Sequence, residues 1–257
     1  AGAVLVERDA RRPMMSGFHA FYSIGGAVGA AAMTGLLALG VAPWVGACLL
    51  VAAMGLIVAL AAPYWRSERA PGDAPMFAIP RGIVLLIGVL CFVAFLGEGV
   101  MLDWSAVFLN QVQGVPAGRA GLGFLVFSVA MTVTRLFGDR AVAWLGQQRA
   151  VLIGGAVAAA GLLLATFASA LPVALVGYAL VGLGCANIVP VLFTLAGNQK
   201  AMPESLAIPA VTTLGYAGVL AGPALVGLVA QLSSLVTAFV LVAIALLLVG
   251  IAARAAR

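Results

Sequence analysis

Charged side chains are what this sequence has least of. Only 8% of its 257 residues are charged and 64% are hydrophobic, whereas a soluble domain carries roughly 25% charged and about 45–50% apolar residues. A soluble core of this length cannot hide so much apolar surface, so lipid must cover the remainder. The composition predicts an all-α polytopic membrane protein with the lipid bilayer as its surroundings.

Metal-binding and nucleophilic residues are also scarce. His19 is the single histidine, and Cys48, Cys91 and Cys185 stand in apolar runs without CxxC spacing. Such cysteines are expected to be small buried hydrophobic residues, and a catalytic zinc site has too few ligands. We therefore expect no metal and no cofactor.

Motifs of several other protein classes are missing. There is no Walker-type phosphate loop and no GxSxG elbow, which argues against ATP drive within the chain and against an intramembrane serine protease. The net charge of +5 is small and dispersed, so it does not form the basic patch that nucleic-acid binding needs. The chain begins with Ala1 and shows no signal peptide, and we expect it to be a fragment of a longer protein.

Long apolar segments fill most of the chain. A spanning helix needs about 20 mostly apolar residues, and eight segments qualify: 16–39, 43–62, 82–106, 119–137, 150–169, 172–195, 206–230 and 234–253. A Pro-rich, charged spacer, 63–81, separates the first two from the last six. Six spans divide into two sets of three, which suggests inverted three-helix repeats within 82–257.

Basic residues in the short loops predict the orientation. With eight spans both ends lie on one side, and that side carries all but one of the 13 Lys and Arg residues, the exception being Arg119. Because loops rich in Lys and Arg stay in the cytoplasm, the spacer and the C-terminus are predicted to be cytoplasmic. The expected location is the bacterial inner membrane.

The third span contains two carboxylates. At about 1.5 Å per residue, Glu98 lies roughly 24 Å beyond Gly82 and Asp103 roughly 32 Å, in a hydrocarbon layer about 30 Å thick. Glu98 is thus inside the membrane, where acids commonly serve proton or ion pathways; the alternative is a protonated Glu hydrogen-bonded to a neighbouring helix. The flanking glycines suggest that the helix is broken there.

Asp103 is predicted to lie near the outer boundary, beside Trp104, which favours that interface. It is a second candidate for proton coupling, or else a wet interfacial carboxylate. Ser105 shares the helical face of Glu98, and Trp104 and Ser105 are candidate substrate contacts.

Three further polar residues at membrane depth are candidate substrate contacts. Asn187 lies near the midplane, where Pro190 should bend the helix just after it; the alternative is an interhelical hydrogen bond. Tyr216, also near the midplane, could line a cavity, although the neighbouring glycines favour helix packing. His19 lies near the cytoplasmic surface, as a substrate contact or a packing residue.

A charged segment, RLFGDRAVAWLGQQR, follows the fourth span. It supplies Arg135, Asp139 and Arg140 as candidates for a charge latch at a cytoplasmic gate. The alternative is ordinary positive-inside topology with arginines reaching toward the surface.

These segments resemble the major facilitator superfamily. Asp139 and Arg140 are similar to the acidic residue and following Arg of the family's cytoplasmic loop motif, although the stretch up to Gly146 is longer than usual. The stretch GEGVMLDWSAVFLN is similar to the seventh-helix signature of one bacterial branch, VERDARRPMMSGFHAFYSIGGAVGA to its fifth-helix region, and GYAGVLAGP to its eleventh helix. The resemblance implies that 1–62 holds the end of helix four and helices five and six, that 63–81 is a cytoplasmic linker, and that 82–257 is the C-terminal six-helix bundle.

The sequence therefore predicts a secondary active transporter of a small polar solute, working by alternating access and coupled to protons. The family's first four helices are absent here and would be needed for transport. The alternatives are a drug or metabolite exporter of the same fold, a structural membrane subunit, and an intramembrane enzyme, which the missing motifs disfavour.

Overall fold

The computed structural model describes residues 2–64 and 79–255, and every regular element in these two ranges is a helix. Most of the predicted linker, 65–78, lies outside the described residues. The helices are α1 (Gly2–Ala10), α2 (Met15–Ala38), α3 (Pro43–Ala61), α4 (Ile83–Gln111), α5 (Ala117–Ala120), α6 (Leu122–Leu145), α7 (Gln147–Phe167), α8 (Leu171–Cys185), α9 (Ile188–Asn198), α10 (Glu204–Leu232) and α11 (Leu235–Ala252), with short 3₁₀ turns at Ala62–Tyr64 and Ala253–Ala255.

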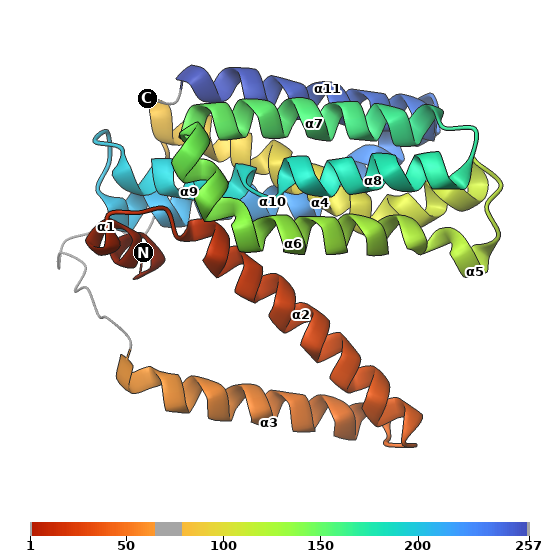
Figure 1. Cartoon of the computed structure of the whole chain (residues 1–257), viewed down its shortest axis with the longest axis horizontal. Helices are drawn as coiled ribbons and strands as arrows, with labels where there is room; N and C mark the ends of the chain where they lie inside the picture. Colours follow the sequence, from red (N-terminus) through yellow and green to blue (C-terminus); the bar gives the residue numbers. More distant parts are fainter. Residues whose placement is uncertain (1, 65–78, 256–257) are drawn as a thin grey trace.

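Helices α4 and α6 to α11 form one bundle, which we call the C-terminal bundle (Figure 1). Within it α4 packs along α10, α6 along α8, and α7 along both α8 and α11. Small residues permit these approaches: a Cβ on Gly155 of α7 would lie 2.6 Å from the carbonyl oxygen of Leu246 on α11. Without a strong hydrophobic force between helices in lipid, such close backbone packing supplies much of the attraction.

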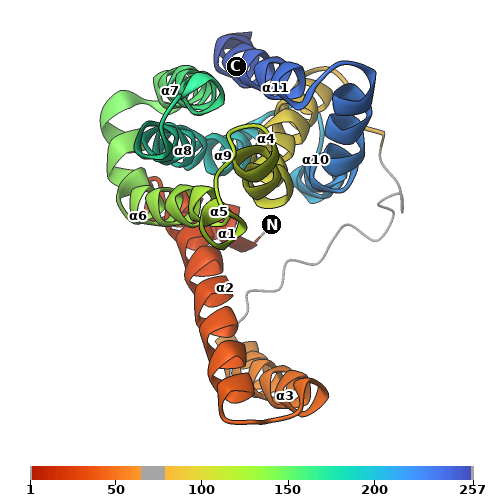
Figure 2. The same ribbon diagram turned by 90° about the vertical axis from the view of Figure 1, so that its right-hand side faces the viewer.

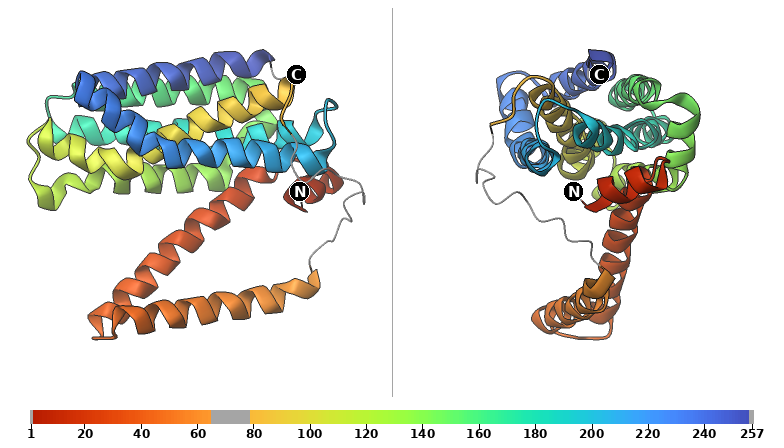
Figure 3. Two further views of the ribbon diagram at one scale, coloured as in Figure 1. Left: turned by 180° about the vertical axis from the view of Figure 1, so that it is seen from behind. Right: turned by 90° about the vertical axis from the view of Figure 1, so that its left-hand side faces the viewer.

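Helices α2 and α3 leave the C-terminal bundle. The beginning of α2 contacts α6 and α9, and the helix then diverges until it meets α3, which runs back at a distance from the bundle (Figures 1 and 2). The view from behind shows the same separation (Figure 3). Among the residues of α3 only Gly46, which has no side chain, is buried, so this apolar helix presents its surface to lipid or to other segments.

The prediction of an all-α membrane protein is confirmed. Seven segments of the described residues are long and apolar enough to cross a membrane, and they correspond to the second to eighth predicted spans. The first predicted span, 16–39, matches α2, a helix of 24 residues that is not among those seven, so the count of eight stays a prediction.

Two local predictions about helix continuity are wrong. Helix α4 continues through Glu98 without a break, because its glycines serve packing: a Cβ on Gly97 would lie 2.9 Å from the side chain of Leu246. The break occurs instead between α8 and α9, at Ala186 and Asn187. The charged segment, which is predicted to lie between the spans 119–137 and 150–169, is helical to Leu145, and Gly146, with a φ of 78°, links α6 directly to α7.

Candidate functional site

An ion pair lies inside the C-terminal bundle. Arg135 of α6 places Nη2 3.2 Å from Oε1 and 3.5 Å from Oε2 of Glu98, which lies near the middle of α4. The side chains are only 5% and 18% exposed, respectively. Glu98 therefore has a charged partner, as expected of an intramembrane acid.

The remaining contacts of Arg135 join two other parts of the chain to this pair. Nη1 donates to the hydroxyl oxygen of Ser23 on α2 at 3.0 Å, and Nε donates to the carbonyl oxygen of Ala186 at 3.2 Å. That carbonyl is available because Pro190, four residues later, has no N–H to offer it. The break after α8 thus supplies a backbone acceptor for a buried guanidinium.

A buried ion pair such as this one contributes little net free energy to folding. Removing two charges from water costs several kcal/mol each, and a buried pair replaced by apolar residues is commonly neutral or stabilising. The burial of this pair is therefore weak evidence for a stabilising role. The geometry places an acidic side chain, Glu98, against a guanidinium that stays charged, Arg135.

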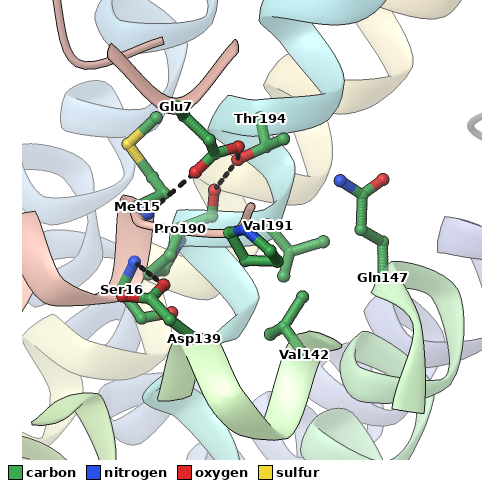
Figure 4. A pocket seen from close by; sticks show the side chains of 10 residues that line it. Glu7, Met15, Ser16, Asp139, Val142, Gln147, Pro190, Val191 and Thr194 are labelled. Carbon is green, nitrogen blue, oxygen red and sulfur yellow. Dashed lines mark hydrogen bonds between the residues drawn. The ribbon is translucent and has the colours of Figure 1, made fainter. Parts of the chain in front are cut away.

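The second part of the site gathers around the first turn of α2 (Figure 4). Glu7 accepts hydrogen bonds from the backbone N–H groups of Met14 and Met15 at 3.0 and 2.8 Å. Asp139 of α6 accepts those of Ser16 and Gly17, both at 2.9 Å. The first N–H groups of a helix lack intrahelical partners and carry a partial positive charge. Two carboxylates therefore satisfy the start of α2, and one of them, Asp139, joins it to α6.

Asn187 joins this second cluster. The hydroxyl group of Ser16 donates to Asn187 Oδ1 at 2.8 Å. Gly138 of α6 lies against both side chains, and any Cβ there would collide with Asn187 Oδ1. A small pocket beside the cluster, lined in part by Glu7, Asp139 and Thr194, has room for about one water molecule (Figure 4).

Among the described residues, the other predicted substrate contacts make no hydrogen bond with the ion pair. His19 on α2 has Nδ1 2.9 Å from the carbonyl oxygen of Met15, and its ring lies 5.9 Å from that of Phe193. Ser105 is fully buried and donates to the carbonyl oxygen of Met101. Their roles as substrate contacts stay predictions.

Tyr216 of α10 is half exposed, and its ring stacks on that of Phe95 at 5.4 Å. The partly buried Trp104 packs against Gly227, and Asp103 is exposed on α4. The structure does not bring Asp103 to Glu98. The two residues are five positions apart on α4, which places them on different sides of the helix.

The predicted gating residues separate into two groups. Arg135 points to Glu98 and Ser23, one turn away from Asp139, which binds the backbone of α2. Arg140 is exposed. Asp139 engages the start of α2, because the N–H groups of Ser16 and Gly17 lie opposite it. The gating role of Arg135, Asp139 and Arg140 stays a prediction.

Sequence reasoning missed Ser16, Ser23, Glu7 and Thr194. A signal for the first two is present: Ser16, His19 and Ser23 recur at spacings of three and four, which places them on one face of a helix. Glu7 lies eight residues before Met15 and accepts from Thr194 Oγ1 at 2.7 Å on the distant helix α9. No local pattern indicates that contact.

The described residues contain no group of three or more His, Cys, Asp or Glu side chains that could hold a metal ion. The site is instead an ion pair, a capped helix start and a broken helix inside a membrane bundle. These features are typical of a polytopic membrane protein with a polar pathway through its helices.

Comparison with known proteins places the chain in a family. It is 49% identical over 98% of its length to an uncharacterized MFS-type transporter of Yersinia pestis, and 34% identical over 96% to the uncharacterized transporter y4wD of Sinorhizobium fredii. It is 32% identical over 58% of its length to the membrane protein MosC of Rhizobium meliloti, covering 36% of that protein. No protein-family model matches it.

The chain belongs to the major facilitator superfamily, as its motifs indicate. It spans 66% and 67% of the lengths of the first two relatives. Those two relatives are named as transporters and not as enzymes, in line with the prediction of a non-enzyme.

Proposed function

We propose that the protein containing this chain is a secondary active transporter that moves a small polar solute across the bacterial inner membrane by alternating access. The observation that carries this proposal is the buried pair of Glu98 and Arg135, which is bonded to Ser23 of α2. This site thus lies where a helix of the N-terminal segment meets the C-terminal bundle. Two helical units that meet around a buried polar site are what rocking-type transport requires.

Glu98 is the residue that we propose to couple transport to protons. It is the more exposed member of the pair, at 18%, so it is the group that a water path could reach. Protonation of Glu98 would remove its attraction for Arg135 and allow the two helices to separate.

The start of α2 supplies the proposed gate. Asp139 holds the backbone of Ser16 and Gly17, and release of those bonds would free α2 from α6. Such a contact biases the balance between two conformations without touching the solute.

The packing within 82–257 supports the proposed inverted repeats. If α4, α6 and α7 form one triplet and α8–α9, α10 and α11 the other, the first helix of each triplet packs on the second of its counterpart, and the two third helices pack together. Helix α1 and the last turn of α11 lie at the same end of the bundle in Figure 1, as the cytoplasmic assignment of the C-terminus needs.

The test is uptake into vesicles that contain the full-length protein, with and without an imposed pH gradient, after a thermal-shift screen for solutes. Glu98→Gln should abolish the dependence of uptake on the gradient, whereas Asp103→Asn serves as the comparison for the second carboxylate. Gradient-driven uptake that is unchanged by Glu98→Gln would remove Glu98 from the coupling. Reversing the gradient distinguishes an importer from an exporter.

A further inference from the structure

The contacts of Arg135 indicate the charge of the solute, an inference that rests on the proposed transport function. Arg135 is 4% exposed, and a guanidinium cannot be deprotonated inside a protein. Its positive charge therefore persists whatever happens to its partner. The state of Glu98 decides whether that charge is neutralised.

The hydrogen bonds of this pair are also longer than those of a strong Arg–carboxylate pair. A strong pair uses two nitrogens and two oxygens at about 2.7–2.9 Å. Here a single nitrogen, Nη2, serves both oxygens of Glu98, at 3.2 and 3.5 Å. The second hydrogen of Nη1 has no partner among the described residues, since Nη1 bonds only to Ser23.

No other acid in the described residues is placed to replace Glu98. Asp139, one turn along α6, is committed to two backbone N–H groups of α2. The titratable groups that interact electrostatically with the pair from the neighbouring helices are Cys91 on α4, Cys185 on α8 and His19 on α2, and none of these is a carboxylate. Ser23 and the carbonyl of Ala186 are uncharged.

We propose that the solute is a small oxyanion, a carboxylate or a phosphate, that takes the place of Glu98 on Arg135. When Glu98 accepts a proton, Arg135 becomes a buried cation without a counter-ion, which is an unfavourable state. An incoming anion supplies the missing counter-ion and accepts the hydrogen of Nη1 that Ser23 leaves unused. Proton and anion therefore load together, and Arg135 determines the charge of the solute.

The test uses the full-length protein in detergent as wild type, Glu98→Gln, Arg135→Gln and the double variant. Glu98→Gln imitates the protonated acid and should unfold at a lower temperature than wild type, and adding Arg135→Gln should reverse the loss. A Glu98→Gln protein as stable as wild type would overturn the proposal, because Arg135 would then bear no uncompensated charge.

The same four proteins are then exposed to acetate, succinate and inorganic phosphate, with acetamide, succinamide and glycerol as uncharged counterparts. At least one anion should bind Glu98→Gln about tenfold or more tightly than wild type, since the competing carboxylate is gone. The double variant should not respond. The proposal fails if none of the three anions stabilises Glu98→Gln, if the double variant responds equally, or if the uncharged compounds act as well.

Should Glu98→Gln not fold, wild type provides the measurement. Addition of the effective anion in weakly buffered solution should be accompanied by uptake of one proton, which a pH-sensitive dye records. Arg135→Gln should abolish both binding and proton uptake, and Arg135→Lys should restore them in part. Anion binding without proton uptake, or with no dependence on Arg135, overturns the inference.

Vesicle uptake of the same six compounds separates this inference from the proposed function. Proton-driven uptake of an uncharged compound would support the transport function and contradict the proposal of an anionic solute. Anion binding with the expected dependence on Arg135, but without any uptake, would support the anion site and contradict the proposed transport function.

Discussion

Arg135 donates from Nε to the carbonyl oxygen of Ala186 at 3.2 Å, at the break between α8 and α9. This is the place where an uninterrupted helix would put the N–H of residue 190. Because residue 190 is proline, the carbonyl remains open, and a charged side chain from another helix fills the position. A helix irregularity and a buried charge therefore depend on each other.

Replacing Pro190 by Ala should test that dependence. The new N–H could bond to Ala186 and compete with Arg135, while the helix gains a better-suited residue. We expect an unchanged or higher unfolding temperature together with transport reduced about tenfold, the order that one charged hydrogen bond is worth.

Pro172→Ala is the matched control for this change, since Pro172 lies in the first turn of α8, where proline removes no helical bond. Full transport by the Pro190→Ala protein would mean that the Ala186 contact is incidental.

Asp139→Asn should weaken the hold on α2. An amide has one acceptor oxygen and turns an N–H₂ group toward a backbone N–H that Asp139 now binds, so one contact of about 1.5–3 kcal/mol is lost. The population in which α2 has separated from α6 should rise. Spin-label distances between the two helices would report it.

Arg149→Gln is the control at the same end of the bundle, because Arg149 is exposed. If both variants give the wild-type distance distribution, Asp139 is not a gate.

Gly138→Ala should disturb the contact between α6, Ser16 and Asn187. The added Cβ would lie 2.8 Å from Ser16 Cβ and even closer to Asn187 Oδ1. Overpacking of this kind costs about 1–3 kcal/mol, so the unfolding temperature should fall. Gly118→Ala, where a Cβ meets nothing within 4 Å, should leave it unchanged, and equal behaviour of the two variants would contradict the packing described here.

Ala158→Leu should destabilise the junction of α7 and α8. Ala158 is fully buried, and Gly184 of α8 lies directly against its backbone, so the larger side chain separates two helices that depend on close approach. Ala160→Leu, on the exposed side of α7, adds the same volume toward lipid. The expected result is a loss of folded protein in size-exclusion chromatography for the first variant only.

Part of the site could be predicted from single residues of the sequence. Glu98 stands out because an acid in an apolar segment is costly wherever the helix turns, and Asn187 with Pro190 indicates an irregular helix. The partner of Glu98 could not be predicted from the sequence. Arg135 looked like one of several arginines at the cytoplasmic end of a span, since nothing in its neighbours indicates that α6 is rotated to direct this side chain inward.

The sequence by itself determined the helical membrane class and the positions of most spans, because the preference of an apolar segment for lipid is a property of that segment alone. Only the tertiary structure decided that Arg135 meets Glu98, that Asp139 holds the start of α2, and that α4 stays continuous while the chain breaks at Ala186. These outcomes depend on how each helix is rotated and how closely glycines let its neighbours approach, which are properties of pairs of helices and not of any single segment.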